Sequence, residues 1–244
     1  MAAVHGSGVG ILFDEFDMSS YFNQATLTKS VQVVDDTRFQ PGVALPNRTY
    51  IPGPGEGSVS FQGLWDATAV SGSDVVLDAA LGTDTIITVG VGGYATVGDP
   101  AVMLQALNAG YQTRSSVNDA VRVVANATAT PGGIRVNGKI LHGLTAETTT
   151  MNGASVNNLA SSAFGGVGHL HVTAFTGTNA TVKIQDSPND AAWSDLIAFT
   201  SITGVTSQRL TDTGTVDQYV RAIISVDNFT SMTFAVSFAR NRRL

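Results

Sequence analysis

The sequence predicts an all-β protein with one short helix. Apolar and polar residues alternate with a period of two in many short segments along the 244 residues, and these segments are rich in β-branched and aromatic side chains. Gly, Pro, Asn or Asp bounds each segment, as expected for turns between strands. With 43% hydrophobic and only 13% charged residues, the chain has enough apolar surface for a globular core.

Eight segments are predicted to form strands, and many short strands of this kind are typical of all-β folds. No apolar run approaches the ~18 residues of a membrane span. The first residues lack the basic start and long apolar centre of a secretory signal, so we expect a cytosolic product. The predicted strands are residues 26–34, 58–64, 119–127, 133–141, 169–175, 180–186, 218–226 and 231–240.

One segment, Pro100 to Ala109, is predicted to be helical. Asp99 suits the amino-terminal cap, Pro100 the first helical position and Gly110 the carboxyl-terminal stop. A single helix in an all-β chain is expected to cover a sheet face or edge that would otherwise be exposed.

Three segments do not show a strand pattern. Residues 1–13 are expected to be a flexible amino-terminal arm. Residues 35–57 form a predicted loop far longer than an ordinary hairpin connection, which is typical of functional loops. Residues 143–168, rich in Thr, Ser, Asn and Gly, resemble a linker. Because neither flank of that stretch is large enough to protect its own strand edges, we predict a single domain over residues 1–244.

The composition argues against several classes of site. The absence of cysteine removes disulfides, thiolate metal sites and cysteine nucleophiles. The net charge of −6 argues against wrapping a nucleic acid, because that mode needs a surplus of Lys and Arg. We find no catalytic set and no cofactor loop, so we predict a protein that is not an enzyme and needs no cofactor.

A few polar or aromatic residues are candidate sites. His169 and His171 lie two apart on a predicted strand and could share a metal, but two ligands make a weak site, so we favour a polar strand face. Asp14 and its acidic neighbours are expected in a solvated turn. Trp193 could stack on a sugar, but we favour a core position.

Two stretches resemble proteins of long-tailed bacteriophages. "NRTYIPGPGEGSVSFQGLWDA" (residues 47–67), a Pro/Gly-rich turn followed by an alternating strand, resembles a region of major tail tube proteins. The block of residues 165–226, which begins "GGVGHLHVTAF", is similar to segments that recur in structural proteins of such phages. Together the two stretches span about a third of the chain.

The resemblance implies a β-sandwich or partial barrel of the phage tail tube type, without an active site. Such subunits form six-fold rings that stack into a tube, work with other tail proteins, bind no membrane, and let DNA pass without specific binding. The chain would then be assembled in the host cytoplasm and belong to the virion tail. The 35–57 loop would grip the next subunit or ring, through Arg38, Phe39, Pro41, Leu45, Tyr50, Ile51 and Pro54.

Two other functions stay open. A capsid decoration or other virion protein would share the all-β pattern, and a carbohydrate-binding β-sandwich would need exposed coplanar aromatic residues. In a tube, acidic or small residues would be expected to face the DNA, because carboxylates repel phosphates over roughly a Debye length of ~8–10 Å.

Overall fold

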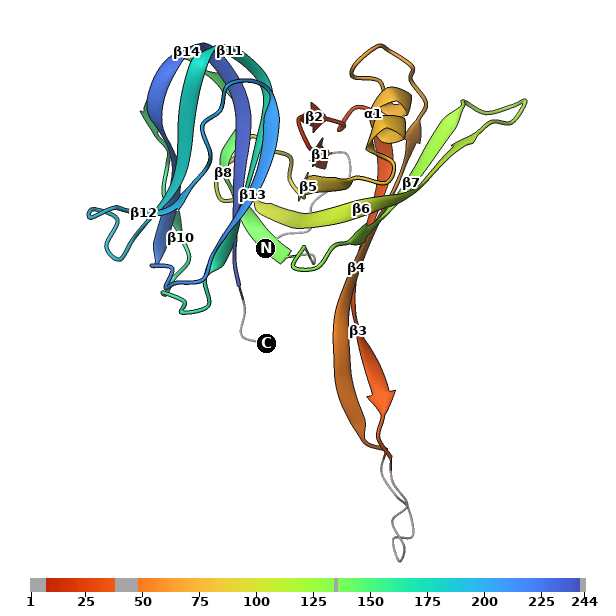
Figure 1. Ribbon diagram of the computed structural model, residues 1–244, viewed down its shortest axis with the longest axis horizontal. Helices are drawn as coiled ribbons and strands as arrows, with labels where there is room; N and C mark the ends of the chain where they lie inside the picture. Colours follow the sequence, from red (N-terminus) through yellow and green to blue (C-terminus); the bar gives the residue numbers. More distant parts are fainter. Residues whose placement is uncertain (1–7, 38–47, 134–135, 242–244) are drawn as a thin grey trace, which may run out of the picture.

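The computed structural model describes residues 8–37, 48–133 and 136–241 (Figure 1). The prediction of an all-β chain with one short helix is confirmed: in these residues the strands form one antiparallel sheet with the core order β12-β11-β14-β8-β6-β5-β1-β2. The elements are β1 (Gly10–Phe13), β2 (Phe16–Asp17), β3 (Phe22–Asp35), β4 (Tyr50–Leu64), α1 (Ser73–Ala80), β5 (Asp84–Gly90), β6 (Pro100–Arg114), β7 (Arg122–Ala129), β8 (Val136–Glu147), β9 (Met151–Asn152), β10 (Val156–Asn157), β11 (Gly166–Ser187), β12 (Ser194–Ala198), β13 (Thr206–Asp212) and β14 (Tyr219–Arg240).

The amino-terminal half is a sheet with one face buried under the helix. The strands pair in the sequence β3-β4-β7-β6-β5-β1. Alternate residues such as Phe61 and Leu104 point into a core that α1 covers with Val76 and Leu77. The predicted role of a single helix, covering a sheet face, therefore holds for α1, although α1 lies elsewhere in the sequence.

The carboxyl-terminal half is built from one long, bent pair of strands. β11 and β14 pair along their whole length, with register shifts near Gly177, and both curve over at the top of Figure 1. The bend lets Leu170 and Val172 from one end of β11 pack with Val182 and Ile184 from the other end in one core cluster. The strands predicted separately at 169–175 and 180–186 are thus one strand, and so are those at 218–226 and 231–240.

The predicted helix at Pro100–Ala109 is wrong, because these residues begin β6. β6 lies in the middle of the sheet and pairs with β5, β7 and β8. Its apolar residues also fit a period of two: Val102 and Leu104 reach one core, and Ala101 and Met103 reach another. Burial on both faces removes the alternation that would have marked a strand.

The three segments without a strand pattern are more ordered than predicted. In the 1–13 arm, residues 10–13 are the buried strand β1, while residues 1–7 lie outside the described residues. In the 35–57 loop, residues 50–57 belong to β4. The 143–168 stretch contains the end of β8 and the short strands β9 and β10, both paired with β14. It wraps the carboxyl-terminal half and is not a free linker.

Candidate assembly interface

A two-stranded ribbon projects from the sheet. It consists of residues 29–35 of β3 and 50–57 of β4, beyond the point where β7 stops pairing with β4 at Ser58 (Figure 1). Within the described residues β3 pairs with β4 alone, so its other edge has free backbone groups. A two-stranded ribbon is only marginally stable by itself, and an open edge can pair with another strand. The ribbon is therefore a candidate surface for pairing with another strand.

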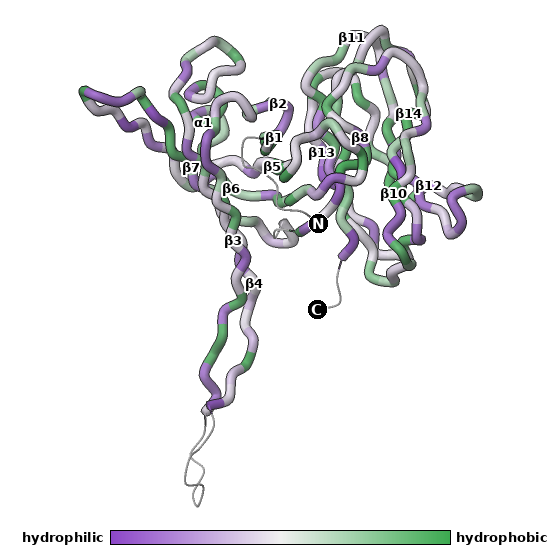
Figure 2. Tube along the Cα trace, turned by 180° about the vertical axis from the view of Figure 1, so that it is seen from behind, coloured by the Kyte–Doolittle hydropathy of each residue, from purple (hydrophilic) through white to green (hydrophobic). Residues whose placement is uncertain are grey.

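The ribbon exposes apolar side chains on both of its faces. Directly opposed residues of an antiparallel pair share a face, so Val34 and Ile51 lie on one face and Val33 lies with Pro52 on the other. The apolar stretches of β3 and β4 appear in green along this arm in Figure 2. The large hydrophobic residues are between 51% and 67% exposed: Val31, Val33, Val34, Tyr50 and Ile51.

The residues predicted to form the subunit contact divide into two groups. Tyr50, Ile51 and Pro54 lie on β4 in the ribbon, and all three are exposed. The other four lie outside the described residues: Arg38, Phe39, Pro41 and Leu45. The three exposed valines of β3 were not among the predicted contacts, although the "SVQVV" alternation could have identified them.

A second open surface is the polar face of β3, β4 and β7. Residues that are directly paired between β3 and β4 and between β4 and β7 form three rows of side chains on this face. The opposite face carries the core residues Val59 and Phe61. These three rows contain no charged residue, but the same face continues into the pair Leu64–Arg122 at one end and the pair Ser30–Glu56 at the other. Small or acidic residues were expected on a face toward DNA. The rows are Thr28–Ser58–Thr128, Thr26–Ser60–Asn126 and Gln24–Gln62–Val124.

The histidine pair lies in a buried seam between the two halves of the chain. The His171 Nδ1 donates to the Asp14 carbonyl oxygen (2.6 Å), because a carbonyl can only accept. The Nε2 of neutral His171 therefore accepts from the Thr88 hydroxyl (2.8 Å), and Thr88 Oγ1 accepts from His169 Nδ1 (3.1 Å). His169 Nε2 is left buried without a partner among the described residues.

This seam corrects two expectations. His169 and His171 do share one strand face, but that face is fully buried and not a polar surface. Asp14 is not in a solvated turn: its Oδ1 accepts from the Ile86 amide (2.8 Å) and the Ser207 hydroxyl (2.9 Å). Burial raises the Asp14 pKa to about 6, because its effect outweighs the lowering of the pKa by these two hydrogen bonds. Burial also lowers the His171 pKa to about 4 and holds the His169 pKa well below its usual value.

Trp193 is not in the core as predicted. Its ring is partly exposed, and the Arg221 guanidinium lies 4.1 Å from the ring centroid. Arg221 also donates to Gln185 Oε1 through Nη2 (2.8 Å). A sugar would have to compete with Arg221 for that ring face, so the geometry does not favour a stacking platform.

Neither a metal centre nor a membrane helix is found in the part of the chain that the structure describes. There, no group of three or more His, Asp or Glu side chains is arranged to hold a metal ion. In the same residues, no helix has the length and hydrophobicity needed to span a membrane.

Comparison with known proteins gives similarities of fold at low identity. No protein-family model and no curated protein sequence matches the chain. One similar structure is a chain of the native gene transfer agent virion, with 13% sequence identity and a TM-score of 0.40. The aligned region covers 53% of this chain and 95% of the virion chain. The SPP1 tail tube structure is 12% identical, with a TM-score of 0.41. The aligned region covers 55% of this chain and 78% of the tail tube chain. The SPP1 Dit protein, described as a hub of the adsorption apparatus, is 12% identical, with a TM-score of 0.37. The aligned region covers 96% of this chain and 99% of the Dit chain.

Proposed function

We propose that the chain is a structural subunit of a phage tail that assembles with copies of itself into stacked rings, six-fold as the tail tube resemblance implies. The observation that carries the proposal is the β3–β4 ribbon, which is apolar on both faces and open along one edge. A ribbon of this kind gains stability when it lies between other subunits. The contact would include Arg38, Phe39, Pro41, Leu45, Tyr50, Ile51 and Pro54, together with the β3 valines.

The exposed apolar surface is large enough to drive association. Fully burying a Val or Ile side chain contributes ~1.5–3 kcal/mol, so covering the exposed half of one ribbon residue contributes about 1 kcal/mol. Val31, Val33, Val34, Tyr50 and Ile51 together would give roughly 5 kcal/mol before the entropic cost of association. Each subunit of a ring makes such a contact more than once, so a modest single contact is sufficient.

The polar face of β3, β4 and β7 is proposed as the surface along which DNA passes. Phosphate binding needs Lys or Arg. The three rows from Thr28 to Val124 contain neither, and Arg122 in the next row is held in an ion pair with Asp119 (3.0 Å). Hydroxyl and amide side chains stay hydrated and hold no counter-charge for a phosphate. We propose that this face lines the conduit, that the subunit acts in the virion tail beside other tail proteins, and that it is assembled in the host cytoplasm.

The chain is proposed to act as one unit over residues 1–244. β6 and β8 pair across the two halves, and the Asp14, Thr88 and His171 hydrogen bonds close the seam between them.

Electron microscopy and sedimentation of the purified protein at rising concentration test the proposal. Rings or tubes with a central hole are expected for the natural chain, and Val33→Asp combined with Ile51→Asp should abolish them. Val117→Asp is the matched control, because Val117 is fully exposed outside the ribbon. Particles that stay monomeric at every concentration, and that do not join tubes when a tail-tip complex is supplied, would overturn the proposal.

A further inference from the structure

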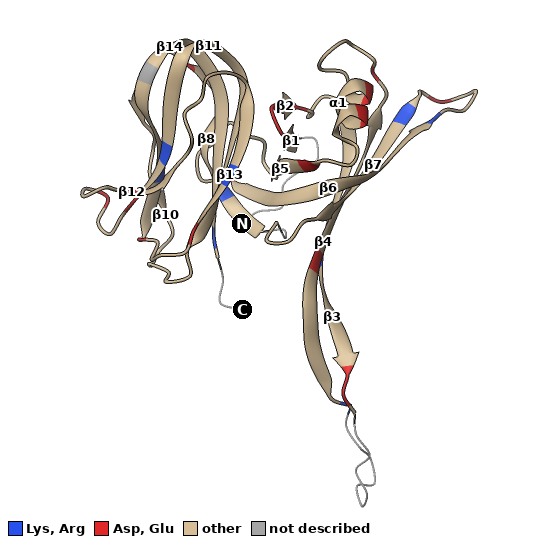
Figure 3. Cartoon of the chain, in the orientation of Figure 1, with Lys and Arg blue, Asp and Glu red and all other residues tan. Residues whose placement is uncertain are grey.

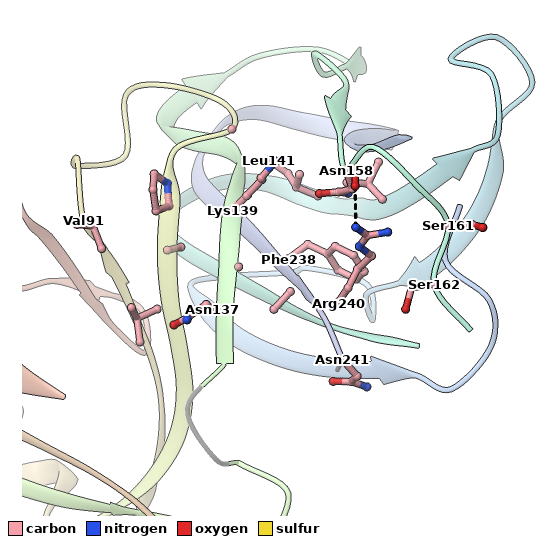
Figure 4. Close-up of a pocket in the computed structure, with 17 residues that line it drawn as sticks. Val91, Asn137, Lys139, Leu141, Asn158, Ser161, Ser162, Phe238, Arg240 and Asn241 are labelled. Atoms are coloured by element: carbon pink, nitrogen blue, oxygen red, sulfur yellow. Dashed lines mark hydrogen bonds between the residues drawn. The ribbon is translucent and has the colours of Figure 1, made fainter. Parts of the chain in front are cut away.

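A pocket of about 630 Å³ opens where β6, β8 and the end of β14 meet the segment 158–162 (Figure 4). Its wall is partly apolar, with Val91, Pro100 and Phe238, and partly polar. A volume of this size is enough for a few side chains of another protein.

The charged groups of the pocket are both cationic. Arg240 donates to the carbonyl oxygens of Asn158, at 2.9 Å, and Ala160, and Lys139 Nζ lies 3.4 Å from the Asn157 carbonyl. No Asp or Glu is among the described residues that line the pocket, and within that part of the chain neither cation is in an ion pair. Partial burial lowers the pKa of Arg240. The pocket is a cationic site that lacks an anion in a chain of net charge −6.

The outward face of α1 has the complementary chemistry. Asp78 is exposed and has no ion-pair partner among the described residues. It lies beside two exposed apolar residues, Val75 (37% exposed) and Leu81 (47%). Acidic residues on α1 and basic residues near the carboxyl-terminal end of β14 lie in separate parts of Figure 3, so one molecule cannot satisfy its own pocket with its own helix.

We propose that α1 of a second copy docks at this pocket, with Asp78 facing Lys139 and Arg240 and with Val75 and Leu81 against the apolar wall. This inference rests on the proposed ring-forming function and adds the lateral contact between neighbours. Because the helix and the pocket are different surfaces of the same chain, the contact is head to tail. Repetition of a head-to-tail contact closes a ring when the rotation per subunit allows it.

Charge exchange across the contact is the test. Asp78→Lys alone and Lys139→Glu alone should each raise the protein concentration needed for ring formation at least tenfold. Sedimentation velocity measures this concentration. The double variant should recover part of that loss, because opposite charges again face each other at positions 78 and 139, while Arg240 is unchanged. Lys139 is chosen in place of Arg240 because its single carbonyl contact is long, so its replacement should leave the pocket folded.

Controls separate this contact from the ribbon and from misfolding. Asp78→Asn should weaken assembly, whereas the same change at exposed Asp190 should not. Equal thermal melting of monomeric variants would show that folding is intact. If the natural chain forms rings, the ribbon variant abolishes them and the charge variants do not change them, the docking inference is wrong and the proposed function stands. If the natural chain forms no rings by itself and joins no tubes when a tail-tip complex is supplied, both fail.

Discussion

Replacing Asp14 by asparagine should stabilise the protein at neutral and alkaline pH. The side-chain amide oxygen of the Asp14→Asn variant would still accept from the Ile86 amide and the Ser207 hydroxyl, which now bond to Asp14 Oδ1. What disappears is a carboxylate whose pKa burial raises from 3.8 to about 6. The raised pKa means that the folded chain holds the protonated acid more tightly than the unfolded chain does.

The magnitude follows from that pKa difference. A change from 3.8 to about 6 corresponds to roughly 3 kcal/mol. Since the folded pKa is the higher one, the contribution of this group to stability is complete below pH 3.8 and is lost as the pH rises through about 6. The Asp14→Asn variant should therefore match the natural chain near pH 3.5 and exceed it by roughly 3 kcal/mol above pH 7.

Urea unfolding followed by tryptophan fluorescence between pH 3.5 and 8 measures this difference. His171 titrates in the same range but is present in both proteins, so the difference between the two curves isolates Asp14. Asp14→Ala is the control, because it removes the acceptor of both hydrogen bonds and should be less stable than Asp14→Asn at every pH. A difference between the natural chain and Asp14→Asn that does not vary with pH would refute the reasoning.

Three further predictions concern the seam and the sheet. Thr88→Val should lower the free energy of unfolding by ~2–4 kcal/mol, because two buried imidazole nitrogens lose their partner, while Thr88→Ser should retain most of the stability in the same urea assay. Since the His171 pKa is lowered to about 4, its contribution is complete above pH 6.5 and is lost as the pH falls toward 4, and His171→Gln should remove that acid dependence. Gly63→Ala should lower the free energy of unfolding by ~1–3 kcal/mol, because the added Cβ would lie 2.1 Å from the Tyr21 carbonyl oxygen. The control Gly204→Ala should melt like the natural chain, because the space around Gly204 is open.

The period-two pattern predicted the strands well because most of them have one buried and one polar face. It failed at Pro100–Ala109 because β6 is buried on both faces, where spacing alone cannot separate a strand from a buried helix. The true helix could have been found: Val76, Leu77 and Ala80 have helical spacing, and Asp74 lies in the first turn. Its amino-terminal cap is Gly72, without a side-chain cap bond, so the usual start signal is absent.

The seam could not have been predicted from the sequence. Asp14, Thr88 and His171 come from distant segments, and each looks like an ordinary surface residue in its own neighbourhood. Only the packing of β1 and β5 against β11 brings them together. The exposed position of Tyr50 and Ile51 was easier to anticipate, because both belong to a local Pro/Gly-rich pattern. Its extension into β3 depends on the β3–β4 register, which an isolated segment does not specify.

The two proposed contacts should respond oppositely to salt. The contact of Asp78 with Lys139 and Arg240 is ionic and partly exposed, and at 1 M salt the screening length falls to ~3 Å, so sodium chloride should weaken it. The ribbon contact is apolar, and sulfate salts strengthen apolar burial. Sedimentation in sodium chloride should therefore show rings dissociating, while the same protein in ammonium sulfate should retain ribbon-dependent particles that Val33→Asp removes. Assembly that is equally insensitive to both salts would contradict the ionic contact and leave the ribbon as the one supported interface.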